Sequence, residues 1–150
     1  MIRIVPTKAE YADDIYEIEQ ASFSMPWSKR AIEEEILNKH AVCLTALDEN
    51  GTVIGHANMR HIINEGHINN IIVAEHHRRK GAASMLVAEL IKAAVQKEMI
   101  GLTLEVRQSN CAAIRLYEKH GFAAEGVRKS YYSKPTEDAI IMWKHIEVHI

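Results

Sequence analysis

The stretch Gly101–Phe122 (GLTLEVRQSNCAAIRLYEKHGF) combines a short strand, a polar corner and a short helix. Apolar and polar residues alternate in its strand part, and this period of two sends Glu105 to the sheet face opposite the leucines and the valine. Asn110 can cap the helix that follows. Apolar residues recur there every three or four positions and carry Tyr117 back toward the strand, and Gly121 ends the helix. The stretch therefore brings a carboxylate and a phenol to one strand.

The remaining sequence predicts an alternation of strands and helices. Expected strands lie at about 2–5, 41–47, 52–63, 67–73, 102–106, 123–132 and 139–143, and expected helices at about 8–21, 29–38, 82–99 and 111–120. Strand 67–73 (HINNIIV) ends in consecutive apolar residues, which favours a buried, central place in the sheet. The order β-α-α-β-β-β-α-β-α-β-β predicts an α+β fold, and 150 residues fit one domain spanning 1–150.

Charge and composition exclude several classes of partner. The 18 basic and 20 acidic residues give a net charge of -2, so no overall field attracts nucleic acid or an anionic membrane. No apolar run approaches the ~20 residues of a membrane span. The two cysteines lack metal spacing, and His76-His77 are too close in sequence for a helical zinc face. We expect a cytoplasmic protein, a monomer or weak homo-oligomer, with no metal and no direct contact with nucleic acid or membrane.

The turn Arg78–Ala83 (RRKGAA) lies between a buried strand and a long helix. At such a corner several backbone amides lack partners inside the helix and can bind an anion. Gly81 permits close approach of the backbone. Arg78, Arg79 and Lys80 supply positive charge for a phosphate or pyrophosphate. The segment lacks the features of a Walker loop and of the three-glycine dinucleotide fingerprint. A charge run can also be a solvated turn, but its place at a strand-to-helix corner favours the anion site.

The segment between the first two predicted helices contains a break. Pro26 cannot continue the first helix, and Ser28 can cap the second. Phe23 and Trp27 flank the break. They either pack the two helices together or form a wall of the site that binds the acceptor substrate, and the two roles are compatible. Trp27 is therefore a candidate substrate-binding residue.

Four stretches of the chain resemble one enzyme family. The spacing R-x-x-G-x-A, at Arg78, Gly81 and Ala83, is similar to the acetyl-coenzyme A pyrophosphate loop of the GCN5-related N-acetyltransferases. MPWS (25–28), LEVRQSNCAAIRLYEKHGF (104–122) and RKSYYSKPTEDAIIM (128–142) are similar to bacterial members that acetylate the N-terminal alanine of a small-subunit ribosomal protein. The resemblance spans essentially the whole chain. It implies three layers, with a mixed, mostly antiparallel sheet of about six to seven strands flanked by about four helices. One departure is Ala83, where the family often has glycine.

The resemblance also implies roles for single residues. With acetyl-coenzyme A as cosubstrate, the expected cofactor-binding residues are Ile71, Ile72, Val73, Arg78, Arg79, Lys80, Gly81, Ala82, Ala83, Ser84 and Asn110. The N-terminus of the acceptor is expected to contact Tyr131, Tyr132, Glu137 and Asp138. Glu105 is implied as the proton acceptor and Tyr117 as the proton donor to the leaving thiolate. Simple aromatic packing also accounts for the pair Tyr131-Tyr132.

Elementary acid–base chemistry agrees with these roles. An amine attacks a thioester only when neutral, and an α-amino group of pKa about 8 is about a tenth neutral at pH 7, a cost near 1.4 kcal/mol. For a lysine side chain of pKa about 10.4, the cost of reaching the neutral form is about 4.6 kcal/mol. A carboxylate such as Glu105 therefore suits a protein N-terminus better than an unperturbed lysine. Taken alone, a strand glutamate is more often a cross-strand charge partner, and a helix tyrosine such as Tyr117 more often belongs to the core.

Two other functions fit the same residues. One is a broader N-terminal or small-molecule amine acetyltransferase, which would turn over unrelated amines at similar rates. The other is a coenzyme A-binding module without chemistry. Direct attack of an N-terminal amine in a ternary complex is the preferred hypothesis, because the module would need neither Glu105 nor Tyr117.

Overall fold

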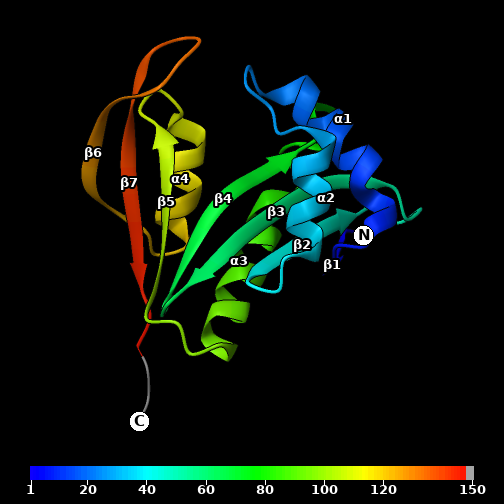
Figure 1. Cartoon of the computed structure of the whole chain (residues 1–150), viewed down its shortest axis with the longest axis horizontal. Coiled ribbons are helices and arrows are strands. Elements are labelled where there is room, and N and C mark those ends of the chain that lie inside the picture. The colour runs from blue at the N-terminus through cyan, green and yellow to red at the C-terminus, as the bar shows by residue number, and fades with distance from the viewer. Residues whose placement is uncertain (148–150) are drawn as a thin grey trace.

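The computed structural model describes residues 1–147 (Figure 1). The strands within these residues are β1 (Arg3–Pro6), β2 (Ala41–Leu47), β3 (Val53–Ile62), β4 (Glu65–Val73), β5 (Gly101–Arg107), β6 (Ala123–Tyr132) and β7 (Glu137–His145). The helices are α1 (Ala12–Ser22), α2 (Lys29–Leu37), α3 (Ala82–Gln96) and α4 (Cys111–Lys119), with the 3-10 turns η1 (Ala9–Tyr11) and η2 (Glu75–His77). The predicted order of strands and helices is confirmed.

Local capping explains where two of the helices begin. The Ser28 hydroxyl accepts a hydrogen bond from the amide of Ala31 at 3.1 Å and caps α2. The Asn110 side chain accepts from the amide of Ala113 at 3.2 Å and caps α4 in the same way. Past the end of α4, Gly121 adopts the left-handed conformation with φ 93°. The predicted strand, corner and helix of the opening stretch are therefore present.

A few boundaries differ from the predicted ones. α3 ends at Gln96 rather than near Met99, because the chain turns at Glu98 with φ 58°. The first predicted helix begins with the 3-10 turn η1 before α1. β7 extends beyond the predicted 139–143 at both ends, because it pairs with β5 as far as His145 and with β6 from Glu137.

The strands form one mixed sheet in the order β1-β2-β3-β4-β5-β7-β6. All neighbours are antiparallel except β4 and β5, which are parallel. β4 therefore lies at the centre, as its apolar end predicts. One apolar cluster joins α1 and α2 to the sheet, and a larger one joins α3 and α4 to the opposite face (Figure 1). The three-layer α+β architecture is confirmed.

Parallel strands β4 and β5 pair over a short distance only. The register joins Glu65–His67 to Gly101–Thr103, and the two strands then diverge (Figure 1). At this junction Gly66 packs so closely that an added Cβ would collide with the Leu102 side chain. From Ile68 to Val73, β4 keeps β3 as its neighbour, while its other edge has no strand partner among the described residues. The sheet is therefore open between the outer ends of β4 and β5.

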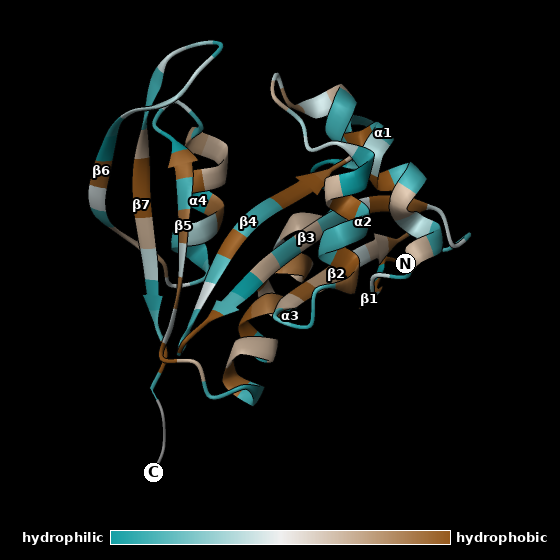
Figure 2. Cartoon of the chain, viewed as in Figure 1, coloured by the Kyte–Doolittle hydropathy of each residue, from teal (hydrophilic) through white to brown (hydrophobic). Residues whose placement is uncertain are grey.

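Hydropathy follows the layers. The outer part of β4 is strongly apolar, and α1 and α2 carry both apolar and polar residues (Figure 2). α3 contributes Leu86, Val87 and Leu90 to the core, each fully buried. No helix in residues 1–147 combines the length and apolar character needed to cross a membrane.

Candidate active site

Glu105 lies on β5 beside the gap between the two diverging strands. Its neighbours Leu104 and Val106 are buried in the core cluster shared with α4. Because side chains alternate along a strand, Glu105 projects from the opposite face. There its side chain is 25% exposed, and Oε1 lies 3.4 Å from Nε of Arg128 on β6. The carboxylate is therefore accessible, with one cation beside it.

Tyr117 lies on α4 and is buried, with its ring centroid 5.8 Å from that of Phe122. Burial raises the pKa of Tyr117 to about 12, and Tyr132 adds to the shift. The phenol is therefore protonated at neutral pH and can donate a proton. Because Tyr117 packs in the same core cluster as Leu104, α4 brings it to the face of β5 opposite Glu105.

Tyr132 adjoins both proposed catalytic residues. Its pKa is raised to about 12, first by burial and then by the proximity of Tyr131 and Glu105. Tyr132 in turn adds to the raised pKa of Tyr117. The Tyr131 ring meets the Tyr132 ring edge-on at 5.0 Å, and the Arg107 guanidinium lies 4.5 Å from the centroid of Tyr132. The sequence predicts the same substrate-binding role for both tyrosines. In the structure, Tyr131 is half-exposed, whereas Tyr132 lies deeper, beside the catalytic candidates.

Glu137 and Asp138 are held within the protein. Glu137 accepts a hydrogen bond from the amide of Ser109 and pairs with Arg107 at 3.3 Å. Hydrogen bonds from Ser109 lower the pKa of Glu137. Asp138 accepts from the amide of Ser130 at 2.8 Å, which lowers its pKa. Glu137 therefore ties the start of β7 to the corner between β5 and α4, and Asp138 ties β7 to β6. An acceptor would have to share both carboxylates.

The segment after β4 has the geometry expected of an anion site. Arg79 and Gly81 both have positive φ, 64° and 89°, and α3 begins directly after Gly81 with no side-chain cap. The first amides of α3 are therefore open to a ligand. Arg78 behaves differently from its neighbours, because its Nε donates to the carbonyl of Val73 at 3.0 Å. Its side chain therefore contacts β4, although Arg78, Arg79 and Lys80 are all exposed.

The other predicted cofactor residues divide between the two faces of β4 and the two helices α3 and α4. Ile72 is buried toward α1 and α2, and Val73 is buried toward α3. Ser84, in the first turn of α3, shares a hydrogen bond of 2.8 Å with Nε2 of His120 at the end of α4. Ile71 is half-buried on β4. At the start of α3, Ala82 is buried and Ala83 is half-buried, and Asn110 caps α4.

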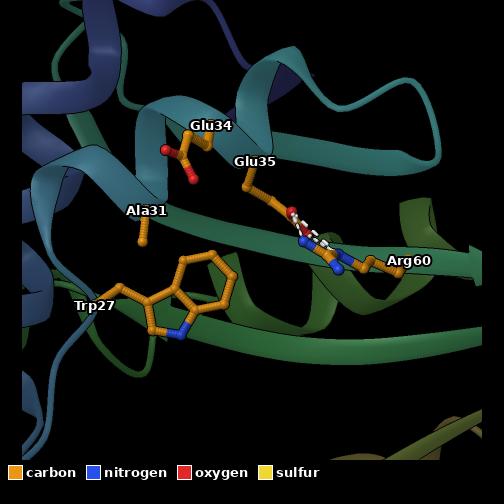
Figure 3. A pocket seen from close by; sticks show the side chains of 5 residues that line it. All are labelled: Trp27, Ala31, Glu34, Glu35 and Arg60. Atoms are coloured by element: carbon orange, nitrogen blue, oxygen red, sulfur yellow. Dashed lines mark hydrogen bonds and ion pairs between the residues drawn. The ribbon is translucent and has the colours of Figure 1, made fainter.

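Trp27 lines a pocket of about 310 Å³ together with Ala31, Glu34, Glu35 and Arg60. Figure 3 shows Glu35 and Arg60 pointing toward one another, with Trp27 on the other side of the pocket. Arg60 holds the buried Glu35 through Nη2 at 2.8 Å and Nε at 3.1 Å. A second hollow of about 630 Å³ lies at the turn between β3 and β4. Neither of these two hollows is lined by the catalytic candidates.

Sequence reasoning missed Glu19. This residue of α1 is 1% exposed, and Oε1 accepts from the amide of Trp27 at 3.0 Å. Oε2 accepts from Nδ2 of Asn70 on β4 at 2.7 Å. The available signal was its position, since Glu19 follows Ile15 by four residues and so falls on the buried stripe of the helix. Sequence reasoning also missed Arg128, which lies in the segment RKSYY (128–132).

In residues 1–147, no group of three or more His, Cys, Asp or Glu side chains could hold a metal.

Comparison with known proteins places the chain among acetyltransferases. The pattern of the Acetyltransferase (GNAT) family matches residues 12–122. The chain is 36% identical over 135 residues to a protein of Escherichia coli strain K12 named ribosomal protein bS18-alanine N-acetyltransferase, covering 85% of this chain and 86% of that one. It is 35% identical over 135 residues to the protein of the same name from Haemophilus influenzae, covering 85% and 88%.

A solved structure gives the same result. The crystal structure of the ribosomal-protein-S18-alanine N-acetyltransferase from Escherichia coli superposes with a TM-score of 0.91 at 29% identity, covering 100% of this chain and 97% of that one. The similarity therefore includes the strands and helices on both sides of the gap between β4 and β5.

Proposed function

Because this chain belongs to the GNAT acetyltransferase family, we propose that it transfers the acetyl group of acetyl-coenzyme A to the N-terminal alanine of a small-subunit ribosomal protein. The observation that carries the proposal is the placement of Glu105 beside the open gap in the sheet, with the buried Tyr117 on the opposite face of β5. We infer that residues 1–150 work as one domain, in the cytoplasm, where the acceptor is made.

The gap and the adjoining turn fit coenzyme A. The free edge of β4 at residues 71–73 offers backbone groups to an extended, amide-bearing arm. At Gly81 an added Cβ would meet nothing within 4 Å, so space is open next to the first amides of α3. The pyrophosphate would lie there, near Arg79 and Lys80, where amides and cations both favour an anion. Bound in this way, acetyl-coenzyme A supplies the acetyl group as a thioester.

Glu105 and Tyr117 divide the proton transfers between them. Glu105 accepts the proton that the acceptor nitrogen loses as its bond to the acetyl carbon forms. Tyr117, held protonated by burial, donates the proton that the sulfur gains as the carbon–sulfur bond breaks. The raised pKa of Tyr117 means that the phenol still carries this proton at neutral pH.

The nature of the acceptor rests on two supports. An α-amino group is neutral far more often at pH 7 than a lysine side chain, which suits a base of modest strength such as Glu105. The relatives that cover most of this chain bear names of bS18-alanine N-acetyltransferases. The N-terminus of ribosomal protein bS18 is therefore the proposed acceptor.

Acetylation of two matched peptides tests the proposal. One peptide begins with a free alanine and contains no lysine, and the other has a blocked N-terminus and one lysine. Mass spectrometry should find acetyl-coenzyme A-dependent transfer to the α-amino group only. Preference for the lysine, or similar turnover of unrelated small amines, would reject the acceptor. Binding of coenzyme A with no transfer to any amine would instead indicate a binding module.

A further inference from the structure

We propose that Glu19 is a positioning residue that holds segment 23–27, between α1 and α2, in the conformation that receives the acceptor. This inference rests on the proposed function, since it takes Trp27 as part of the acceptor site. It concerns a residue that makes its contacts through the loop and has no part in the proton transfers.

Glu19 closes segment 23–27 at both ends. Its backbone carbonyl accepts from the amide of Phe23 at 3.1 Å, and its carboxylate accepts from the amide of Trp27 at 3.0 Å. Pro26, inside the segment, has no amide hydrogen to offer. One residue of α1 therefore fixes where the loop begins and where it ends.

The same carboxylate joins the loop to the central strand. Its second oxygen accepts from Asn70 on β4 at 2.7 Å. Asn70 directly precedes the β4 segment proposed to hold the cofactor arm. The carboxylate thereby links the backbone of Trp27 to that strand, in addition to the apolar cluster that contains Ile72 and contacts Trp27. On the far side of the loop, Met25 meets the Ser133 hydroxyl at 3.1 Å, so the loop also touches the turn between β6 and β7.

Stability alone gives a poor reason for a carboxylate at this place. Glu19 is 1% exposed, and its side-chain hydrogen bonds come from two neutral donors, the Trp27 amide and the Asn70 amide group. Burial of a carboxylate beside neutral groups disfavours the charged form, and burial accordingly raises the pKa of Glu19. Glu35, the other buried carboxylate, has the Arg60 guanidinium as its partner. A carboxylate retained without a cation, where a loop and a strand meet, indicates a positioning role.

Glu19→Gln tests the inference with the smallest change of shape. The introduced amide can accept only one of the two hydrogen bonds, and its nitrogen then faces a second donor. The acceptor KM should rise about tenfold, the effect of losing about 1.4 kcal/mol. The KM for acetyl-coenzyme A should stay within about twofold, because the turn at residues 78–84 is unchanged. Glu17→Gln, the same substitution at an exposed position of α1, is the matched control and should match the wild type.

A compensating substitution separates positioning from general damage. When Glu19→Gln is combined with Asn70→Asp, the new carboxylate on β4 can accept from the nitrogen of the introduced amide, whose oxygen can accept from Trp27. The acceptor KM should return most of the way to the wild-type value. Where Glu19→Gln alone does not fold, Asn70→Ala removes one of the two bonds and should give a smaller rise. Equal rises in both KM values, or no rise in folded protein, would overturn the inference.

Amide hydrogen exchange provides a readout independent of acetylation. Exchange of the Trp27 amide should accelerate in Glu19→Gln and slow again in the double variant. Unchanged exchange at segment 23–27 would refute the positioning role even if the enzyme acetylates alanine peptides. Conversely, a wild type that transfers no acetyl group would refute the proposed function, and exchange would still decide whether Glu19 holds the loop.

Discussion

The carboxylate of Glu105 on β5 lies 3.4 Å from Nε of Arg128 on β6, although β7 runs between these two strands. Arg128 is half-exposed and also approaches the ring of Tyr131, at 5.8 Å. An acceptor amine arrives mostly as an ammonium, because its pKa of about 8 lies above neutral pH. In the proposed reaction this ammonium therefore competes with the Arg128 guanidinium for the Glu105 carboxylate.

Arg128→Gln should lower the acceptor KM. An exposed ion pair of this kind contributes up to about 1 kcal/mol, so the expected decrease is up to about fivefold. Lys92→Gln removes the same charge from an exposed position on α3 and is the control. Steady-state kinetics at fixed ionic strength should show a lower KM in the first variant only. An unchanged or higher KM in Arg128→Gln would contradict competition for Glu105.

Glu105→Gln should reduce kcat by about 10²- to 10⁴-fold, the usual contribution of a positioned proton acceptor. The substitution keeps the shape of the side chain and removes its basicity. Calorimetry should give the wild-type dissociation constant for coenzyme A, since Glu105 faces away from the turn at 78–84. A variant that retains most of its turnover would exclude Glu105 as the base.

Tyr117→Phe should reduce kcat by about 10²-fold or more while the fold is kept. Phenylalanine preserves the packing against Phe122, so the free energy of unfolding should change by no more than about 1 kcal/mol. The pKa of about 12 also implies that wild-type turnover does not decline through loss of the phenol proton below about pH 11. A pH–rate profile of the two proteins tests the rate and its pH dependence, and a denaturant titration tests the free energy of unfolding.

Gly81→Ala should weaken cofactor binding through backbone strain alone. Gly81 has φ 89°, and an added Cβ would meet nothing within 4 Å. In the free protein the substituted turn can relieve this strain of about 1–2 kcal/mol by leaving the left-handed region, and it must take up the strain again on binding. The dissociation constant for coenzyme A would therefore rise by about tenfold. Gly51→Ala, at φ 79° with equally open surroundings, should lose similar stability without any change in that constant. Equal effects of the two substitutions on binding would argue against an anion site at Gly81.

His56→Leu should remove one pH-dependent part of the stability. Burial lowers the pKa of His56 to about 4, against 6.5 in the unfolded chain. As the pH falls, the unfolded state therefore binds a proton at His56 before the folded state does. The contribution of His56 to the free energy of unfolding is fully present above pH 6.5, and roughly 3 kcal/mol is lost as the pH falls toward 4. Denaturant titrations of His56→Leu should lack that loss, whereas His145→Gln, at an exposed position, should retain it.

Local features of the fold could be predicted because their causes are local. The caps at Ser28 and Asn110, the left-handed Gly121 and the central strand β4 each follow from residues within a few positions of one another. Boundaries such as the extended ends of β7 depend on partners far away in the sequence, and no pattern within β7 reveals them.

The site shows the same division. Alternation along β5 and the apolar stripe of α4 are enough to send Glu105 and Tyr117 to opposite faces of the strand. The approach of Arg128 across β7, and the depth of Tyr132 compared with Tyr131, depend on how β6 pairs with β7. Glu19 was missed because a glutamate on a helix is usually exposed, and its partners come from a loop and from β4.

Gly66 lies at the junction from which β4 and β5 diverge. From Gly66 to Val73, β4 extends roughly 23 Å at about 3.3 Å per residue. A tilt of β4 by only about 2–3° at this junction therefore displaces its outer end by about 1 Å. A misplacement of that size can reduce an enzymatic rate by about 100-fold. An added Cβ at Gly66 would collide with Cδ2 of Leu102, so the close contact of the two strands at their junction depends on the glycine. In the proposed reaction, a larger residue at position 66 should therefore lower the rate by changing how the two strands diverge.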